Sequence, residues 1–347
     1  MSRSPSYMRS ILTIAVLSLM GVACRAQDTT LRTTSTLIVV PTLVQTSAQD
    51  VVYNLSANDF SLKDNGIPQK IRLETAATQP LSLVVLMQTG GAAPLEFQHY
   101  RKLETMLASL LESGAASGHA PNTIAVVNFD SKPEAASPFT SDIAEWTDAI
   151  DHPDPGDRGA AILDGLAYSL RLLEDQPARN RRAILLISQP ADEGSKTPLK
   201  EILRTAAETN TTIYTLTFSP EKAAFKQAFK EKAHLNPPIP GHGQDYFNLS
   251  EPLGMILGAA RKNVAADIAT LTGGEAATFE NQHGLDDDIG AFATHIRNRY
   301  LLTFQPASPT PGLHKLEVRL PHHPELNVSS RSDYWATDSS FTAPANR

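Results

Sequence analysis

The chain has 347 residues, of which 41% are hydrophobic and 19% are charged, and its formal net charge at pH 7 is -7. At about 150 residues per domain, this length allows roughly two domains, and the composition suits a globular core and excludes wholesale disorder. The acidic balance and the lack of a long basic run argue against a nucleic-acid-binding protein. We expect the densest basic cluster, Arg179, Arg181 and Arg182, in a solvated loop before a strand.

The N-terminal residues have the pattern of an export signal. Arg3 and Arg9 precede the apolar run 11–22, and small residues follow at Ala23 and Ala26. This order predicts a secretory signal peptide over 1–26. The run is shorter than the roughly 20 residues of a membrane span, and no later stretch is long and apolar enough. We therefore expect a periplasmic or extracellular protein with no membrane span.

The single cysteine, Cys24, lies inside this signal, so no intrachain disulfide is possible. Two alternatives remain for it. Cys24 is either the acylated first residue of a membrane-anchored lipoprotein or part of a signal that is cleaved after Ala26. The second is favoured, because Gly21 stands where lipoprotein signals normally carry a larger apolar residue.

The first mature segment has the pattern of β-structure. Residues 37–44 are apolar and β-branched, as in a strand. Residues 60–63 and 69–73 alternate around the turn residues 64–66, which predicts a hairpin.

From residue 79 onward, buried strands alternate with amphipathic helices. Continuous apolar runs are typical of strands covered on both faces of a parallel sheet. The predicted strands are 81–87, 123–129, 183–187 and 212–216, with an edge strand at 276–279. The predicted helices are 100–111, 143–150, 161–173, 199–208, 264–270 and 289–297. This alternation predicts an α/β fold with a doubly wound, mostly parallel sheet.

The chain ends, like its start, in β-structure. Strands are predicted at 300–304, 314–320 and 326–330. Neither β segment can bury a face alone, so we expect 27–78 and 299–335 to pair into a small sheet or sandwich. The α/β domain, 79–298, is then an insertion between them, with an irregular part at 219–256 and a disordered tail at 336–347.

The α/β segment resembles the von Willebrand factor A (VWA) domain, and the mature chain resembles bacterial exported VWFA-related domain proteins. Three stretches carry the resemblance: 55–71 around the predicted hairpin, the helix end at 269–274 with its paired glycines, and the strands within 299–318. Together the likeness covers about residues 35 to 335.

This resemblance implies a hard cation such as Mg²⁺ at the carboxyl end of the sheet. The family ligands are an Asp-x-Ser-x-Ser motif, a Thr from a second loop and a further Asp. The corresponding positions here are Gln88, Gly90, Ala92, Ala160 and Gln189, so two carboxylates and three hydroxyls are missing. We therefore expect a degenerate site that holds no metal and no cofactor.

Nearby acids offer an alternative metal site. Three acids lie close in the sequence to the positions where the family ligands are missing: Asp157, Asp192 and Glu193. The simpler explanation is that they are solvated loop acids. Asp164, inside a predicted helix, is interpreted as structural.

No motif of an enzyme is present. The sequence has no Gly-x-Ser-x-Gly, no phosphate-binding loop and no His-Glu-x-x-His. We expect a non-catalytic module that binds a protein partner through the loops 88–95, 155–160 and 189–197, or through 219–256. The alternatives are a structural subunit of an envelope complex and, less favoured, an enzyme whose site includes His234 and His242 of the irregular part.

Overall fold

The computed structural model describes residues 37–75, 79–100, 103–115, 121–177, 179–220, 263–279, 282–306 and 310–336. These described residues belong to one compact unit. The predicted signal peptide, Cys24, the predicted tail beyond Ala336 and nearly all of 219–256, including His234 and His242, lie outside them.

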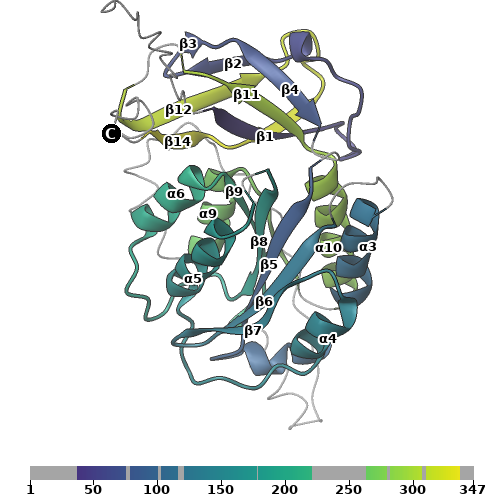
Figure 1. Ribbon diagram of the computed structural model, residues 1–347, viewed down its shortest axis with the longest axis vertical. Coiled ribbons are helices and arrows are strands. Elements are labelled where there is room, and N and C mark those ends of the chain that lie inside the picture. The colour runs from purple at the N-terminus through teal and green to yellow at the C-terminus, as the bar shows by residue number, and fades with distance from the viewer. Residues whose placement is uncertain are drawn as a thin grey trace, which may run out of the picture. The chain divides into compact units, whose positions relative to one another are not determined.

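A six-stranded sheet forms the centre of the α/β part (Figure 1). Its order is β10-β9-β8-β5-β6-β7, and every neighbouring pair is parallel except β6 and β7. The strands are β5 (Leu81–Gln88), β6 (Thr123–Phe129), β7 (Pro133–Thr140), β8 (Arg181–Ser188), β9 (Thr211–Thr217) and β10 (Ala276–Thr278). All eight residues of β5 are buried, as its continuous apolar sequence predicts.

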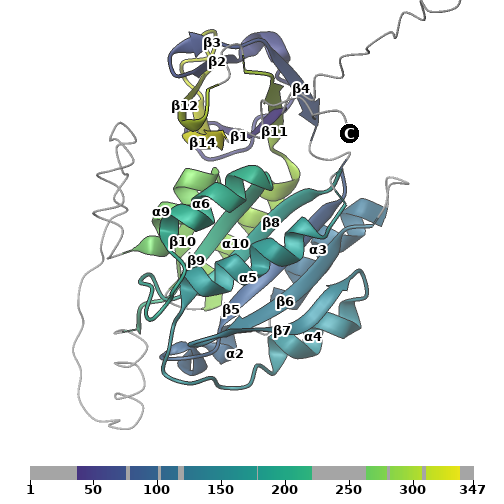
Figure 2. The same cartoon turned by 60° about the vertical axis from the view of Figure 1, so that its left-hand side comes forward.

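Helices cover both faces of this sheet (Figure 2). One face packs against α3 (Leu103–Ala115), α4 (Ile143–Asp151) and α10 (Gln282–Arg297), with the short α2 (Phe97–Tyr100) beside them. The other packs against α5 (Ile162–Glu174), α6 (Leu199–Glu208) and α9 (Val264–Thr272). In α5 the buried residues Ile162, Leu166, Leu170 and Leu173 recur every three or four positions, which is one face of a helix. The predicted doubly wound fold is confirmed.

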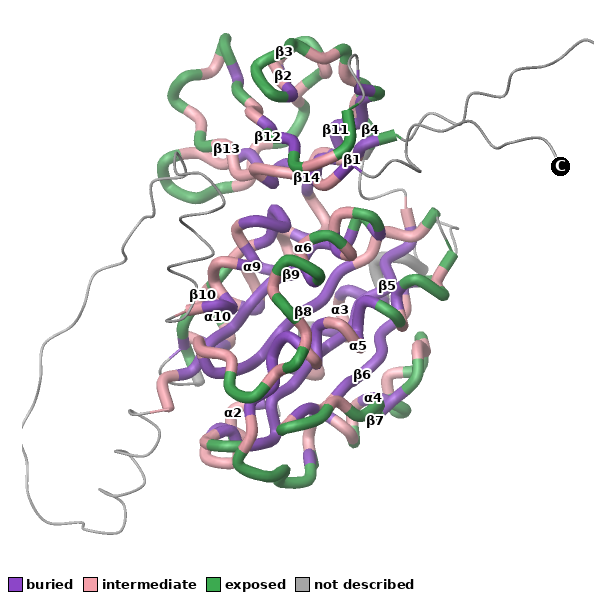
Figure 3. The backbone as a smooth tube through the Cα atoms, turned by 90° about the vertical axis from the view of Figure 1, so that its left-hand side faces the viewer, coloured by how far each residue is buried: buried purple, intermediate pink, exposed green. Residues whose placement is uncertain are grey.

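The two β segments pair with each other, as expected. One antiparallel sheet has the order β13-β1-β11-β4 and the other β14-β12-β2-β3. The strands are β1 (Ile38–Gln45), β2 (Ser61–Asp64), β3 (Ile67–Pro68), β4 (Ile71–Thr75), β11 (Tyr300–Phe304), β12 (Gly312–Arg319), β13 (Asn327–Ser330) and β14 (Asp333–Ala336). Val40, Leu62, Leu302 and Leu316 share one buried cluster, so we call this pair of sheets the sandwich (Figure 3).

The predicted hairpin is only partly right. β2 turns at Asn65 and Gly66, both with positive φ, and pairs with the two-residue β3. The chain then leaves this sheet, and β4 pairs with β11 of the other sheet. Pro68 lacks an N–H group, so it cannot extend the ladder as a donor. Two strands, the eight-residue β7 and the four-residue β14, were not predicted, and α10 begins at Gln282, seven residues before the predicted helix.

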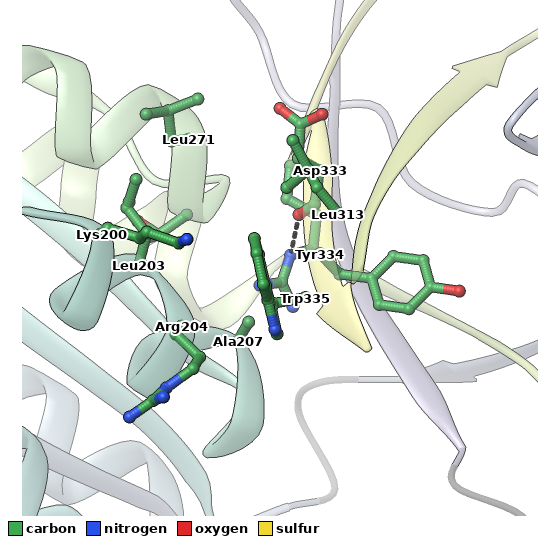
Figure 4. Close-up of a pocket in the computed structure, with 11 residues that line it drawn as sticks. Lys200, Leu203, Arg204, Ala207, Leu271, Leu313, Asp333, Tyr334 and Trp335 are labelled. Carbon is green, nitrogen blue, oxygen red and sulfur yellow. Dashed lines mark hydrogen bonds between the residues drawn. The ribbon is translucent and has the colours of Figure 1, made fainter. Parts of the chain in front are cut away.

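Strand β14 contacts helix α6 through Trp335 (Figure 4). The Lys200 ammonium lies 4.8 Å from the centre of the Trp335 ring, a cation–π distance. The neighbouring Tyr334 points the other way, into the sandwich, because successive strand residues face opposite sides. Because its side chains alternate in direction, the short strand β14 packs Tyr334 into the sandwich core and Trp335 against a helix of the α/β part.

Candidate binding site at the carboxyl end of the sheet

The candidate site lies at the topological switch point of the sheet, where the connections from neighbouring strands pass to opposite faces. From β5 the chain runs through α3 on one face to β6, and it later returns through α5 on the opposite face to β8. Strands β5 and β8 are neighbours, so their carboxyl ends border the crevice in which open α/β sheets hold ligands. Gln88 ends β5, and Gln189 directly follows β8.

Gln88 and Gln189 form a buried amide pair. The Gln88 side-chain oxygen accepts a hydrogen bond from the backbone N–H of Gln189 at 2.8 Å. The Gln88 amide nitrogen donates to the side-chain oxygen of Gln189 at 3.3 Å and to the carbonyl of Gly90 at 3.0 Å. Gln88 is fully buried and Gln189 is 5% exposed. Both side-chain oxygens therefore already accept protein hydrogen bonds.

Gly90 brings its loop close to two others. A Cβ atom placed on Gly90 would lie 2.3 Å from the carbonyl oxygen of Gly159 and 2.8 Å from that of Asp157. Neither backbone atom can rotate away as a flexible side chain would. Any side chain at position 90, a serine included, therefore requires the loops to separate.

Backbone hydrogen bonds join the loops 88–95, 155–160 and 189–197, which we call the loop crown. Gly91 donates to the carbonyl of Asp157 at 2.8 Å, and Gly156 donates to the carbonyl of Thr89 at 2.9 Å. Ala160 and Glu193 form a β-bridge, so the second and third loops are joined as well. Gln88, Gly90 and Gln189 thus meet directly, Ala160 is held at the adjoining bridge, and Ala92 is half-buried where the short 3₁₀ turn Ala93–Leu95 begins.

The three acids considered as substitute ligands each have protein partners. Asp157 accepts hydrogen bonds from the hydroxyl and backbone N–H of Ser131 and from Gly159, and these bonds lower its pKa. Glu193 accepts from the Gln189 amide at 3.1 Å. Within the described ranges, no group of three or more His, Cys, Asp or Glu side chains is placed to hold a metal ion.

Asp192 caps a helix. Its carboxylate accepts from the backbone N–H of Leu163 at 3.0 Å and from the Ser195 hydroxyl. Helix α5 begins after Ala161, whose side chain offers no acceptor, so Asp192 supplies from another loop what an N-cap residue would normally provide. The expectation of a solvated loop acid was wrong for this half-buried residue.

Asp164 holds the third crown loop to α5. Its carboxylate accepts from the backbone N–H groups of Lys196 and Thr197 and from the Thr197 hydroxyl. Partial burial raises the pKa of Asp164, but these hydrogen bonds outweigh burial and leave its pKa below the usual value. The role of Asp164 is structural, as predicted from its position in the sequence.

A fourth loop, which was not predicted from the sequence, borders the site. Asp130 follows β6 and accepts hydrogen bonds from the backbone N–H groups of Lys132 and Asp157. Ser131 binds the Asp157 carboxylate. The loop after β6 could have been placed at the site from the strand order. Strand β6 is the parallel neighbour of β5, and parallel neighbours end at the same edge of a sheet.

Sequence comparison gives no relative: no protein-family model matches the chain, and no curated protein matches it. Solved structures give similarities of fold. BatB from Bacteroides thetaiotaomicron is 16% identical with a TM-score of 0.39, and the match covers 62% of this chain and 98% of that one. A von Willebrand factor type A protein from Catenulispora acidiphila is 10% identical with a TM-score of 0.43, covering 90% and 77%.

A third similar structure is proximal thread matrix protein 1 from the mussel byssus, at 13% identity and a TM-score of 0.43, covering 65% of this chain and 50% of that one. Such identities and TM-scores transfer no function. The strand order, the antiparallel edge strand and the helices on both faces make the α/β part VWA-like.

None of the helices in the described ranges is both long enough and apolar enough to cross a membrane.

Proposed function

We propose that the protein is an exported, non-catalytic interaction module that binds a protein partner through the loop crown without a bridging metal ion. The observation that carries this proposal is the buried amide pair. In VWA-like sites a cation links the domain to its partner, whereas here two uncharged side chains bond to each other across the same two strand ends.

The donor set does not suit a hard dication. Mg²⁺ is normally bound through carboxylate and water oxygens in near-octahedral geometry. Gln88 and Gln189 carry no negative charge, and their oxygens already accept protein hydrogen bonds. The closeness of Gly90 to the Gly159 carbonyl further limits room for a ligand shell.

The loop crown can still present a defined surface. Its loops are tied by backbone hydrogen bonds, so their shape is organised before binding. Arg158, Glu193 and Lys196 are exposed there with mixed charge. A rigid surface of mixed charge recognises a partner by shape and charge complementarity, and it loses little entropy on binding.

Calorimetry with Mg²⁺ and Mn²⁺ tests the absence of a metal. We expect no saturable heat at millimolar metal for the purified chain. Tight binding of either ion would contradict the proposal, above all if partner capture also required it.

Partner capture from an envelope extract of the producing bacterium tests the surface. We expect a partner that the full-length wild type retains in EDTA and that the charge reversals Arg158→Glu and Lys196→Glu release. Arg171→Glu, at an exposed position of α5, is the matched control and should retain it. Equal capture by all variants would exclude the loop crown.

A second candidate function is a structural subunit of an envelope complex held through the sandwich. Among the described residues, the exposed large hydrophobic side chains all belong to the β segments: Leu37, Tyr53, Ile67 and Leu313. Exposed apolar side chains of this size favour protein contact when they gather in one module. Release of the captured partner by Leu313→Glu, with Arg158→Glu inert, would favour this candidate over the loop crown.

Cell fractionation tests whether the protein is exported and whether it is anchored to a membrane. The signal pattern at 1–26 supports release as a free protein after cleavage behind Ala26. We expect the wild type and Cys24→Ser in the same fluid fraction. Membrane association that Cys24→Ser abolishes would establish the lipoprotein alternative instead.

A further inference from the structure

A cavity lies at the opposite end of the sheet from the loop crown. It has a volume of about 250 Å³, and its walls come from the amino-terminal parts of β5, β8 and β9 and from β1, β4 and β11 of the sandwich. For scale, an apolar cavity of about 150 Å³ holds benzene. The space therefore suits a small organic molecule.

The charged residues lining this cavity are mostly arginines. Arg179, Arg181, Arg182 and Arg299 contribute four guanidinium groups, against the single carboxylate of Glu74. Arg181 and Arg182 belong to β8 and are half-buried, so the expectation of a solvated basic loop was wrong for both. The lining thus carries a formal excess of positive charge.

Two of these arginines are anchored by carbonyl groups, not by acids. Arg181 donates to the backbone carbonyls of Gln79 and Ile296, and Arg182 donates to those of Gln176 and Thr209. Burial lowers the pKa of Arg181 to about 10, so Arg181 remains charged at pH 7, and burial also lowers the pKa of Arg182. Carbonyl contacts fix the guanidinium groups in place without neutralising them, and Glu174 offsets the charge of Arg182 only in part.

Arg299 is the most enclosed of the four, at 4% exposed. It donates to the carbonyl of Gly273, faces Glu275 at 3.4 Å and lies against the ring of Tyr214 at 5.3 Å from its centre. Burial raises the pKa of Glu275, but hydrogen bonding to His295 and the charge of Arg299 outweigh it, so its pKa is lowered and it is a carboxylate at neutral pH. That carboxylate partly balances Arg299.

Three residues that line the cavity also carry buried donors without a hydrogen-bond partner. Within the described residues, Nε of Arg182 and Nε of Arg299 are buried without a hydrogen-bond partner, and so is the hydroxyl of Thr303. A buried charged donor that is left unpaired costs free energy, so native structures normally satisfy such groups. Guanidinium groups pair best with planar or tetrahedral oxygen anions.

We propose that this cavity binds a small organic anion through an oxyanion group held by Arg182 and Arg299, with Arg179 at the exposed rim. The excess of guanidinium groups supplies the attraction, N–H groups of the arginines that line the cavity supply the hydrogen bonds, and the volume sets the size. This site is independent of the proposed function at the loop crown.

Calorimetry on the full chain at low chloride, with inorganic phosphate and separately with succinate, tests this site. We expect saturable binding of at least one probe at a single site, and the probe that binds distinguishes a phosphate ligand from a carboxylate ligand. Each probe is titrated to about 10 mM, which is enough to detect a ligand with a millimolar dissociation constant. If neither probe binds at that concentration, the proposal is overturned.

Variants then locate the binding. Arg182→Gln should weaken it at least tenfold, which corresponds to about 1.4 kcal/mol. Arg179→Gln, at an exposed position, should weaken it less and keeps the test valid if Arg182→Gln does not fold. Arg171→Gln removes the same charge from exposed α5 and should leave affinity unchanged. Undiminished affinity in folded Arg182→Gln and Arg179→Gln would refute the assignment, whereas Arg158→Glu in the loop crown should not affect it.

Discussion

At the scale of single residues, Gly90 determines how closely the crown loops approach. Gly90→Ser restores a residue type that the family motif carries, yet its Cβ would meet the Gly159 carbonyl at 2.3 Å. Forcing extra atoms into a packed site typically costs about 1–3 kcal/mol. We expect Gly90→Ser to lower the free energy of unfolding by that amount in urea titrations. Ala92→Ser, at the half-buried second serine position, should change it little; equal effects would show that the loops yield freely.

The amide pair makes a second prediction at this scale. Gln88→Ala and Gln189→Ala should each cost about 1–3 kcal/mol, because each leaves a buried polar group without its partner. The double variant should cost less than the sum, with a coupling of about 0.5–3 kcal/mol. Urea midpoints of the four proteins measure this cycle, and strict additivity would mean that the two side chains do not interact.

Asp288 on α10 makes stability depend on pH. Burial, with a smaller contribution from Asp287, raises its pKa from 3.8 to about 6. The folded state thus favours the protonated acid, and the stability this gives below pH 3.8 is lost as the pH rises through 6. Asp288→Asn should stabilise the protein at pH 7.5 by about 1 kcal/mol, a figure reduced for solvent screening, and by less at pH 5. Thermal unfolding at both pH values measures this, and an equal gain at both would contradict the pKa assignment.

At the scale of elements, helix α5 depends on a cap from outside its own sequence. Asp192→Ala removes the carboxylate that accepts from the Leu163 N–H group. Loss of an N-cap acceptor costs about 1 kcal/mol, so the urea midpoint should fall accordingly. Asp154→Ala, at an exposed position just before the loop 155–160, is the control. A matching loss there would point to general electrostatics instead of capping.

The helices and strands that could be predicted are those in which the pattern of apolar residues matches the pattern of burial. Strand β5 is apolar except for Ser82 and Gln88 because helices cover both its faces, and α5 repeats its apolar residues every three or four positions. Strand β7 has the sequence PEAASPFT and buries only Ser137, so no periodicity marks it. It is a strand because the open edge of β6 accepts it.

The candidate site was predictable in position but not in chemistry. The ends of β5 and β8 must meet once the strand order is known, so Gln88 and Gln189 were placed correctly near each other. Their mutual hydrogen bonds depend on side-chain orientation, which no spacing encodes. The partners of Asp157 and Asp192 come from other loops for the same reason.

At the scale of the whole molecule, buried polar contacts link the N-terminal β segment to the C-terminal one. The Asp64 carboxylate contacts the His314 ring at 2.7 Å and accepts from the Tyr334 hydroxyl at 2.8 Å, all three being nearly fully buried. Leaving a buried polar group without its hydrogen-bond partner costs about 1–3 kcal/mol, and here two partners lose theirs. Asp64→Asn should therefore destabilise the sandwich strongly, and Asp50→Asn, at an exposed position, should not.

Two tryptophans report whether the sandwich and the α/β part unfold together. Trp146 is buried in the α/β core, and Trp335 lies in the sandwich strand β14. In a Trp335→Phe background, fluorescence follows Trp146 alone. Because the described residues form one compact unit, we expect Asp64→Asn to lower the Trp146 urea midpoint as well. An unchanged Trp146 transition would show two independently unfolding parts.

The pairing of β1 with β11 sets an order of events during synthesis. Ile38 pairs with Phe304, and Thr42 with Ser330, so the first strand leaves the ribosome long before either partner exists. The α/β part is complete earlier, since β10 and α10 precede β11 along the chain. Until the last strands arrive, β1, β2 and β4 have open edges, which are the surfaces that chaperones and proteases recognise. Closure of the sandwich therefore distinguishes a finished chain from a truncated one.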